Sequence, residues 1–212
     1  MNTLEKVAAA LYGGKADEVA SLVRQALQER ATPAEVLKEG LIAGMDKVGC
    51  DFRENVLYVP EVLVASRAMH AGMDVLRPLL VSAEASPTGT VAIGTVQGDI
   101  HDIGKNLVVM MLEGAGFQVV DLGVDVKASQ FVEAIVRLRP DILGLSALLS
   151  TTMPTMGNVI RAISDAGLTG KIKIVVGGAP VTDDFAVSIG AHGYAPDAAS
   201  AVVLCRGLVK QE

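Results

Sequence analysis

The sequence predicts an α/β protein of two domains, an N-terminal antiparallel four-helix bundle over residues 1–86 and a doubly wound, parallel five-stranded sheet over residues 87–212. Three observations support this prediction. Up to about Val81, the apolar residues recur at the spacing of amphipathic helices. From Thr90 onward, short runs rich in β-branched residues alternate with helical stretches. Between the two patterns, residues 82–89 are mostly small or turn-forming, which is typical of an interdomain linker.

Four helices are expected in the bundle. One covers Leu4–Tyr12, and the other three carry apolar stripes made by Val19, Leu22, Val23, Ala26 and Leu27; by Leu37, Leu41, Met45 and Val48; and by Val62, Ala65, Met69, Met73 and Leu76. Thr32 to Glu35 fits a capping box, in which Thr32 caps a helix, Pro33 takes the first helical position and Glu35 reaches back to the cap. Short connections favour an antiparallel arrangement of the helices.

The second domain is expected to alternate strands and helices. The expected strands are Thr90–Val96, Gln118–Leu122, Ile142–Ser146 and Ile172–Val176. Most of the expected helices are Gly104–Gly114, Ser129–Arg137, Met156–Ala166 and Ala198–Val209. Because continuously apolar strands are separated by helices, we expect a parallel sheet covered on both faces, with the flavodoxin-like strand order 2-1-3-4-5. Ligands of such folds bind at the carboxyl ends of the strands.

Composition excludes several classes of partner. The chain has 24 acidic and 18 basic residues and a net charge of -6, without a basic run, so nucleic acid is not expected as a partner. No apolar run approaches the roughly 20 residues that span a bilayer, and the N-terminus lacks the features of an export signal. We therefore expect no membrane association and a cytoplasmic location. Cys50 and Cys205 indicate neither a disulfide framework nor a metal site.

The loop after the first expected strand contains the most informative residues. A phosphate-binding loop does not fit, because five residues separate Gly98 from Gly104 and Lys105 is followed by Asn106. No G-x-G-x-x-G dinucleotide fingerprint is present. A phospho-receiver would need an aspartate at the end of the third strand, where Ser146 stands. None of these three kinds of site is therefore expected.

The same loop holds a histidine close to a carboxylate. A lone histidine is more often a helix cap or a surface residue, but the pattern Asp99-x-His101 favours a metal ligand. The carboxylate can accept the proton of one imidazole nitrogen while the other nitrogen binds a metal. No second protein ligand is evident, and a closed zinc site needs about four. A single histidine suits a metal that a macrocycle already holds.

Three short motifs resemble a known signature. It is the cobalamin-binding signature of methionine synthase, the corrinoid mutases and the corrinoid proteins of anaerobic methyltransferases, and its counterparts here are Asp99-x-His101-x-x-Gly104, Ser146-x-Leu148 and Gly177-Gly178. The intervals between the motifs, residues 105–145 and 149–176, are similar to those of the family. Segments 40–45 and 59–62 resemble the helical cap of corrinoid subunits in methylamine, methanol and methoxy-aromatic demethylating systems.

The resemblance implies a cofactor and a role for each matching residue. The cofactor is cobalamin, as methylcobalamin or a related corrinoid, and His101 replaces its benzimidazole as the lower axial ligand of cobalt. His101, Asp99 and Thr152 form a relay that couples release of the imidazole to proton uptake; Thr152 stands where methionine synthase has a serine. The implied cofactor-binding residues are Asp99, His101, Asp102, Ile103, Gly104, Ser146, Leu148, Ser150, Thr152, Gly177, Gly178, Tyr194 and Ala198. His192 replaces an aspartate common in relatives and is interpreted as a surface substitution.

The implied function is that of a corrinoid protein without a catalytic barrel of its own. It would shuttle a methyl group on cobalt from a donor-specific methyltransferase to a second methyltransferase, acting on tetrahydrofolate or a thiol, and a reductive activating protein would be a third partner. Methoxylated aromatics, methylamines, methanol and betaines all fit as donors. Two alternatives stay open: an adenosylcobalamin-dependent mutase subunit, which would not need the helical cap, and a cobalamin-sensing regulator, which would need an output module.

Overall fold

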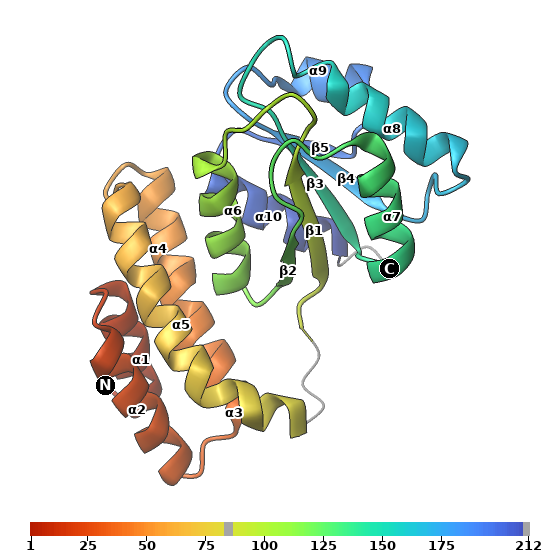
Figure 1. Ribbon diagram of the computed structural model, residues 1–212. Coiled ribbons are helices and arrows are strands. Elements are labelled where there is room, and N and C mark those ends of the chain that lie inside the picture. The colour runs from red at the N-terminus through yellow and green to blue at the C-terminus, as the bar shows by residue number, and fades with distance from the viewer. Residues whose placement is uncertain (83–86, 210–212) are drawn as a thin grey trace. The chain divides into compact units, whose positions relative to one another are not determined.

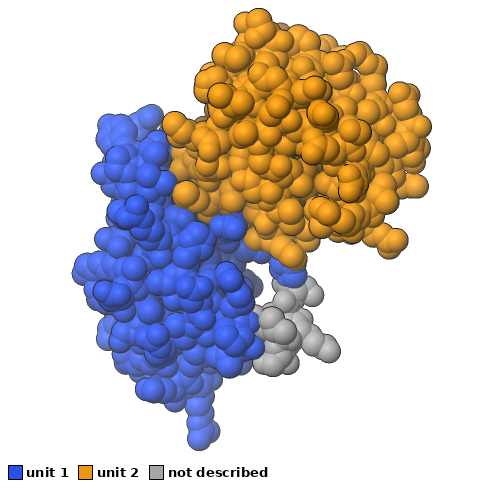
Figure 2. Space-filling view, in the orientation of Figure 1, with its two compact units in different colours: residues 1–87, 113–116 blue, residues 88–112, 117–212 orange. Residues whose placement is uncertain are grey.

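The computed structural model describes residues 1–82 and 87–209 (Figure 1). The chain divides into two compact units, one of residues 1–87 and 113–116, the other of residues 88–112 and 117–212 (Figure 2). Half of the expected linker, residues 83–86, lies outside the described residues, so the boundary between residues 86 and 87 stays a prediction. The α/β fold class is confirmed. Among the described residues, no helix is long and apolar enough to cross a membrane.

Residues 1–82 form the four helical segments that the periodicity predicted. Their bounds are α1 Thr3–Tyr12, α2 Ala16–Gln28, the unbroken run of α3 Pro33–Glu35, η1 Val36–Ile42 and α4 Ala43–Arg53, and α5 Val59–Ser82. The capping box is present, because Thr32 Oγ1 accepts the Glu35 N–H at 3.2 Å while a Glu35 carboxylate oxygen accepts the Thr32 N–H at 2.8 Å. The π-helical segment η1 was not predicted. It passes close to α1, since a Cβ at Gly40 would lie 3.0 Å from a methyl group of Val7.

The second unit contains one parallel sheet in the predicted order, β2-β1-β3-β4-β5. Its strands are β1 Thr90–Thr95, β2 Gln118–Asp121, β3 Ile142–Ser146, β4 Lys173–Gly177 and β5 Gly193–Ala195. Its helices are α6 Ile103–Gly114, α7 Ala128–Leu138, α8 Thr155–Asp165, α9 Asp183–Ser188 and α10 Ala198–Val209. The sequence had not located β5 and α9, because elements of three and six residues are too short to show a periodicity.

Helices cover both faces of the sheet, with α6 and α10 on one side and α7 and α8 on the other (Figure 1). Leu143 and Leu145 of β3 belong to the apolar core that includes Phe131 of α7 and Met156 of α8. Because side chains alternate along a strand, Ser146 points to the opposite face.

A row of small residues ends the strands on the α6 and α10 face. The register aligns the last residues of four strands, Thr95, Ser146, Gly177 and Ala195. None has a side chain larger than that of threonine. The carboxyl edge of the sheet therefore offers backbone and small side chains on this face.

His192, the residue before β5, is hydrogen-bonded to Ile174 of β4. Its N–H donates to the Ile174 carbonyl at 2.7 Å, and its Nδ1 accepts the Ile174 N–H at 3.0 Å. Desolvation, followed by the nearby Lys173 charge, lowers the pKa of His192 below its ordinary value. The side chain is exposed, as a surface residue would be, yet it caps a strand N–H only while Nδ1 is unprotonated.

We predict that His192→Ala lowers the free energy of unfolding by about 1 kcal/mol near neutral pH, the net worth of one hydrogen bond. A lowered folded-state pKa means that this stability is present above the unfolded pKa of about 6.5 and is lost as pH falls through the folded value. Denaturant unfolding above and below that range should show the difference shrinking in acid. His192→Asn, whose amide oxygen can replace Nδ1, is the control; an equal loss at both pH values for His192→Ala would contradict the prediction.

Candidate functional site

The loop between β1 and α6 opens with a tight turn. The Asp99 N–H donates to the Val96 carbonyl at 3.1 Å, and Gly98, the third residue of the turn, has a φ of +87°. A positive φ at this place defines a type II turn and favours glycine. The turn sends the Asp99 side chain inward, where it is fully buried, and leaves 46% of the His101 side chain exposed.

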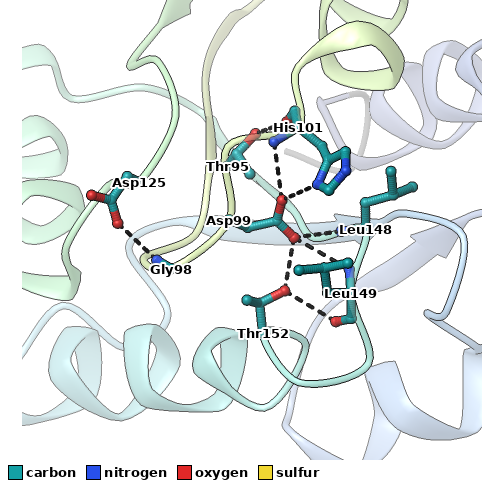
Figure 3. Close-up of polar contacts among 8 residues, drawn as sticks. All are labelled: Thr95, Gly98, Asp99, His101, Asp125, Leu148, Leu149 and Thr152. Carbon is teal, nitrogen blue, oxygen red and sulfur yellow. Dashed lines mark hydrogen bonds and ion pairs between the residues drawn. The ribbon is translucent and has the colours of Figure 1, made fainter.

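The Asp99 carboxylate is the centre of the site (Figure 3). Its Oδ1 accepts the backbone N–H of His101 at 3.0 Å and lies 2.7 Å from His101 Nδ1. Its Oδ2 accepts the N–H of Leu148 at 2.8 Å and that of Leu149 at 3.3 Å. The Thr152 hydroxyl lies 2.7 Å from the same oxygen. One buried carboxylate therefore joins the β1–α6 loop to the segment after β3.

The charge of Asp99 decides the state of the imidazole. Burial alone would raise the pKa of Asp99, but hydrogen bonds from the His101 N–H, the Thr152 hydroxyl and the Leu148 N–H outweigh it and hold the pKa well below its usual range. An ionised carboxylate only accepts hydrogen bonds, so His101 Nδ1 must carry the proton. In the neutral imidazole the lone pair is then on Nε2, for which the described residues supply no hydrogen-bond partner. This is the arrangement of a metal-binding histidine with a carboxylate behind it.

Thr152 is buried next to two acceptors. Its Oγ1 lies 2.7 Å from Asp99 Oδ2 and 3.0 Å from the Leu149 carbonyl oxygen. A hydroxyl has one proton, so Thr152 can donate to only one of these acceptors at a time. The structure thus brings together the three residues of the expected relay, Asp99, His101 and Thr152, in one hydrogen-bonded chain.

Exposed apolar side chains flank His101. Ile100 and Ile103 are its neighbours in the loop, and Leu148 and Leu149 follow β3. All four are large and exposed, and they lie next to His101 in the loop or share its Asp99 carboxylate, while His101 Nε2 has no hydrogen-bond partner among the described residues. A cluster of this kind is typical of a binding surface rather than of an ordinary protein exterior. It suits the face of a large ring with apolar character.

The glycines of the motifs differ in what requires them. Gly178 has a φ of +132°, and a Cβ there would lie 1.8 Å from the Ala147 carbonyl oxygen, so the fold itself demands glycine. A Cβ at Gly177 would lie 3.1 Å from the Ala195 carbonyl oxygen. At Gly104, by contrast, a Cβ would meet no described residue within 4 Å apart from its chain neighbours and its own helix backbone, and φ is not positive. Nothing in the part of the chain that the structure describes explains that glycine, and the open space at the start of α6 fits a bound group.

The remaining expected residues lie at varying distances from this centre. Asp102 is exposed and accepts a hydrogen bond from the Asn106 amide at 3.2 Å, and Ser150 is exposed in the segment after β3. Ala198 is buried as the first residue of α10. Tyr194 aligns with Val176 and packs against the apolar core, so it lies on the face of the sheet opposite to Ser146. Its expected contact with the cofactor stays a prediction.

Two parts of the site were missed from the sequence. Lys105 is almost fully buried and its ammonium pairs with Asp121, at the end of β2, and with Asn106 Oδ1. Asp125 accepts the Gly98 N–H at 2.7 Å. Their only signal was their place, Lys105 directly after the Asp99–Gly104 motif and Asp125 a few residues beyond a strand.

The fold and the site define a class: a helical unit joined to a flavodoxin-like sheet that presents one histidine for a metal held by a planar ligand. Comparison with known proteins agrees. Residues 89–203 match the family model described as the B12 binding domain, and residues 3–77 match a second model with the same description. The chain belongs to the B12-binding family. The expected cofactor, a cobalamin-type corrinoid with its cobalt, is thereby confirmed.

Relatives of the chain are similar along its length. It is 41% identical to dimethylamine corrinoid protein 1 of Methanosarcina acetivorans over 207 residues, 97% of each chain. It is 45% identical to trimethylamine corrinoid protein 2 of the same organism over 188 residues, 88% of this chain and 87% of that one. The crystal structure of the methanol:cobalamin methyltransferase complex of Methanosarcina barkeri matches with a TM-score of 0.87 at 29% identity, covering 99% of this chain and 80% of that chain.

Two of the motif glycines, Gly104 and Gly178, give a matched pair of variants. We predict that Gly104→Ala keeps or slightly raises the stability of the apo-protein, since alanine is the better helix former by up to ~1 kcal/mol, but weakens cobalamin binding about tenfold by overpacking the contact. Gly178→Ala should instead destabilise the apo-protein by about 2 kcal/mol or more through backbone strain and the clash. Denaturant unfolding and spectral titration with cobalamin measure the two effects. If Gly104→Ala bound cobalamin with unchanged affinity, the assignment of Gly104 to the cofactor contact would be contradicted.

Proposed function

We propose that this protein binds a corrinoid with His101 Nε2 as the lower ligand of cobalt and carries a methyl group from a donor-specific methyltransferase to a second methyltransferase. One observation carries the ligand assignment: a buried, ionised Asp99 accepts the hydrogen bond of Nδ1 and leaves Nε2, on a side chain that is 46% exposed, without a hydrogen-bond partner among the described residues. The similarity to corrinoid proteins along almost the whole chain supports the carrier role over that of a mutase subunit or a sensor.

Each residue around the imidazole has a separate task. The corrinoid supplies a cobalt that can accept and give up a methyl group. Asp99 fixes the tautomer and the direction of the ring, so that Nε2 is the nitrogen that can bind the metal. Thr152 and the N–H groups of Leu148 and Leu149 hold the carboxylate ionised. Ser146 and Gly177 would line the path of the displaced nucleotide tail, where the sheet edge offers only small groups.

The relatives named above favour methylated amines as the methyl donors. Corrinoid proteins for dimethylamine and trimethylamine are 41% and 45% identical to this chain over most of its length. A donor-specific methyltransferase would load the carrier, and the acceptor enzyme would methylate tetrahydrofolate or a thiol. A reductive activating protein would restore cobalt that has become oxidised.

The ligand assignment predicts a spectroscopic change. In cobalamin bound to the ¹⁵N-labelled protein and reduced to Co(II), electron paramagnetic resonance should show coupling to one ¹⁵N nucleus, from the protein rather than from the unlabelled cofactor base. His101→Ala should lose this coupling, because no other described histidine lies in the site. His192→Asn, which changes a distant histidine, should keep it. Coupling that persists in His101→Ala would reject the assignment.

The carrier role predicts donor-dependent loading. Holoprotein reduced to Co(I) should be methylated when a methylamine methyltransferase and its amine are both added. The visible spectrum of the bound corrinoid monitors this methylation. Methanol with its own methyltransferase should load it at least about tenfold more slowly, the usual order of a one-contact difference in specificity. Holoprotein that no methyltransferase pair can load would contradict the carrier role.

A further inference from the structure

Asp125, in the loop between β2 and α7, has an unusual backbone conformation. Its φ is +53°, in the left-handed region that residues other than glycine seldom adopt. The conformation is held by the end of β1 and by the loop that follows it. The Asp125 N–H donates to the Asp99 carbonyl at 2.9 Å, and the next residue, Val126, pairs with Val96 and donates to the Thr95 carbonyl at 3.0 Å. A local strain that neighbouring contacts maintain is often linked to function.

The Asp125 side chain acts on the turn that carries Asp99. Its Oδ1 accepts the Gly98 N–H at 2.7 Å (Figure 3). Gly98 N belongs to the central peptide of the turn, and types I and II differ by a rotation of that peptide through about half a circle. The Gly98 N–H has no role in closing the turn, whose hydrogen bond joins Asp99 and Val96. The carboxylate therefore selects the type II form by holding its central peptide.

We propose that Asp125 is a positioning residue for the lower ligand: it locks the turn that aims Asp99, and through Asp99 it fixes where His101 Nε2 points. The inference rests on the proposed ligation of cobalt by His101. Asp125 touches neither the imidazole nor the Asp99 carboxylate in any described contact, so its effect must pass through the backbone of Gly98 and Asp99.

The strand order explains why two loops are needed. Since β1 lies between β2 and β3, the loops after β2 and β3 flank the loop after β1. The segment after β3 holds the Asp99 side chain through Leu148, Leu149 and Thr152. The loop after β2 holds the Asp99 backbone through Asp125. Orientation of the imidazole requires both, because a fixed carboxylate on a mobile backbone would leave the ring free to tilt.

Three substitutions separate the carboxylate from the backbone strain. Asp125→Asn keeps an acceptor oxygen and a residue that tolerates the left-handed region. Asp125→Gly keeps the backbone conformation and loses the acceptor, and Asp125→Ala loses both. If the hydrogen bond to Gly98 matters, Asn should behave as the wild type while Gly and Ala should both be impaired. Denaturant unfolding of each apo-variant checks that it is folded.

The decisive experiment is a double-mutant cycle on cobalamin affinity. Spectral titration of the apo-protein with cobalamin is carried out for Asp125→Ala, His101→Gly and the double variant. Loss of one side chain–backbone hydrogen bond in an exposed turn should raise the dissociation constant about threefold to tenfold when His101 is present. When His101 is replaced, the same change should leave the constant within about twofold, because the contact no longer has an imidazole to aim.

The outcomes distinguish the inference from the function on which it rests. An equal rise of the dissociation constant in both backgrounds, or impairment of Asp125→Asn as severe as that of Asp125→Ala, would overturn the positioning role and leave the ligand assignment standing. Absence of protein ¹⁵N coupling in the wild-type holoprotein would overturn the ligand assignment, and the positioning role with it. Normal binding by Asp125→Gly would show that the carboxylate holds nothing, and would also overturn the inference.

Discussion

A buried carboxylate has to be compensated, and the compensation of Asp99 organises the site. Taking a charged carboxylate out of water is costly unless donors surround it. Here the donors are backbone N–H groups of two loops, one hydroxyl and one imidazole nitrogen. Because each donor must reach the same two oxygens, satisfying the charge also fixes the loops against each other and the ring against the loops. The hydrogen bonds that compensate the charge of Asp99 therefore also fix the position of His101 Nε2.

The parallel sheet makes this compensation possible. Its parallel strands end at one edge, so the loops that follow β1 and β3 are neighbours. Asp99 and Thr152 are far apart in sequence but meet at this edge. The same edge carries the row of small residues that leaves backbone accessible on the α6 and α10 face. A protruding imidazole and a flat, small-residue edge are thus two results of one strand order.

Much of this could be predicted from the sequence, and the failures share a cause. Apolar periodicity located the four helical segments and four strands, and the motifs identified Asp99, His101 and Thr152, because repeated patterns and fixed spacings are local properties of a chain. The π-helical segment η1 and the three-residue β5 depend on contacts between elements. Asp125 escaped notice for the same reason: an isolated aspartate after a strand becomes informative only when its partner, the Gly98 N–H, is known.

The exposed isoleucines and leucines beside His101 have a consequence for the protein before it meets its cofactor. Ile100, Ile103, Leu148 and Leu149 then remain in contact with water, next to a nitrogen able to bind adventitious metal ions. The apo-protein therefore exposes more apolar surface than the holoprotein, and it has an imidazole that can bind other metal ions. Cells that make the polypeptide faster than they make corrinoid would accumulate the apo-protein. The supply of the cofactor would then affect how much of the protein stays in solution.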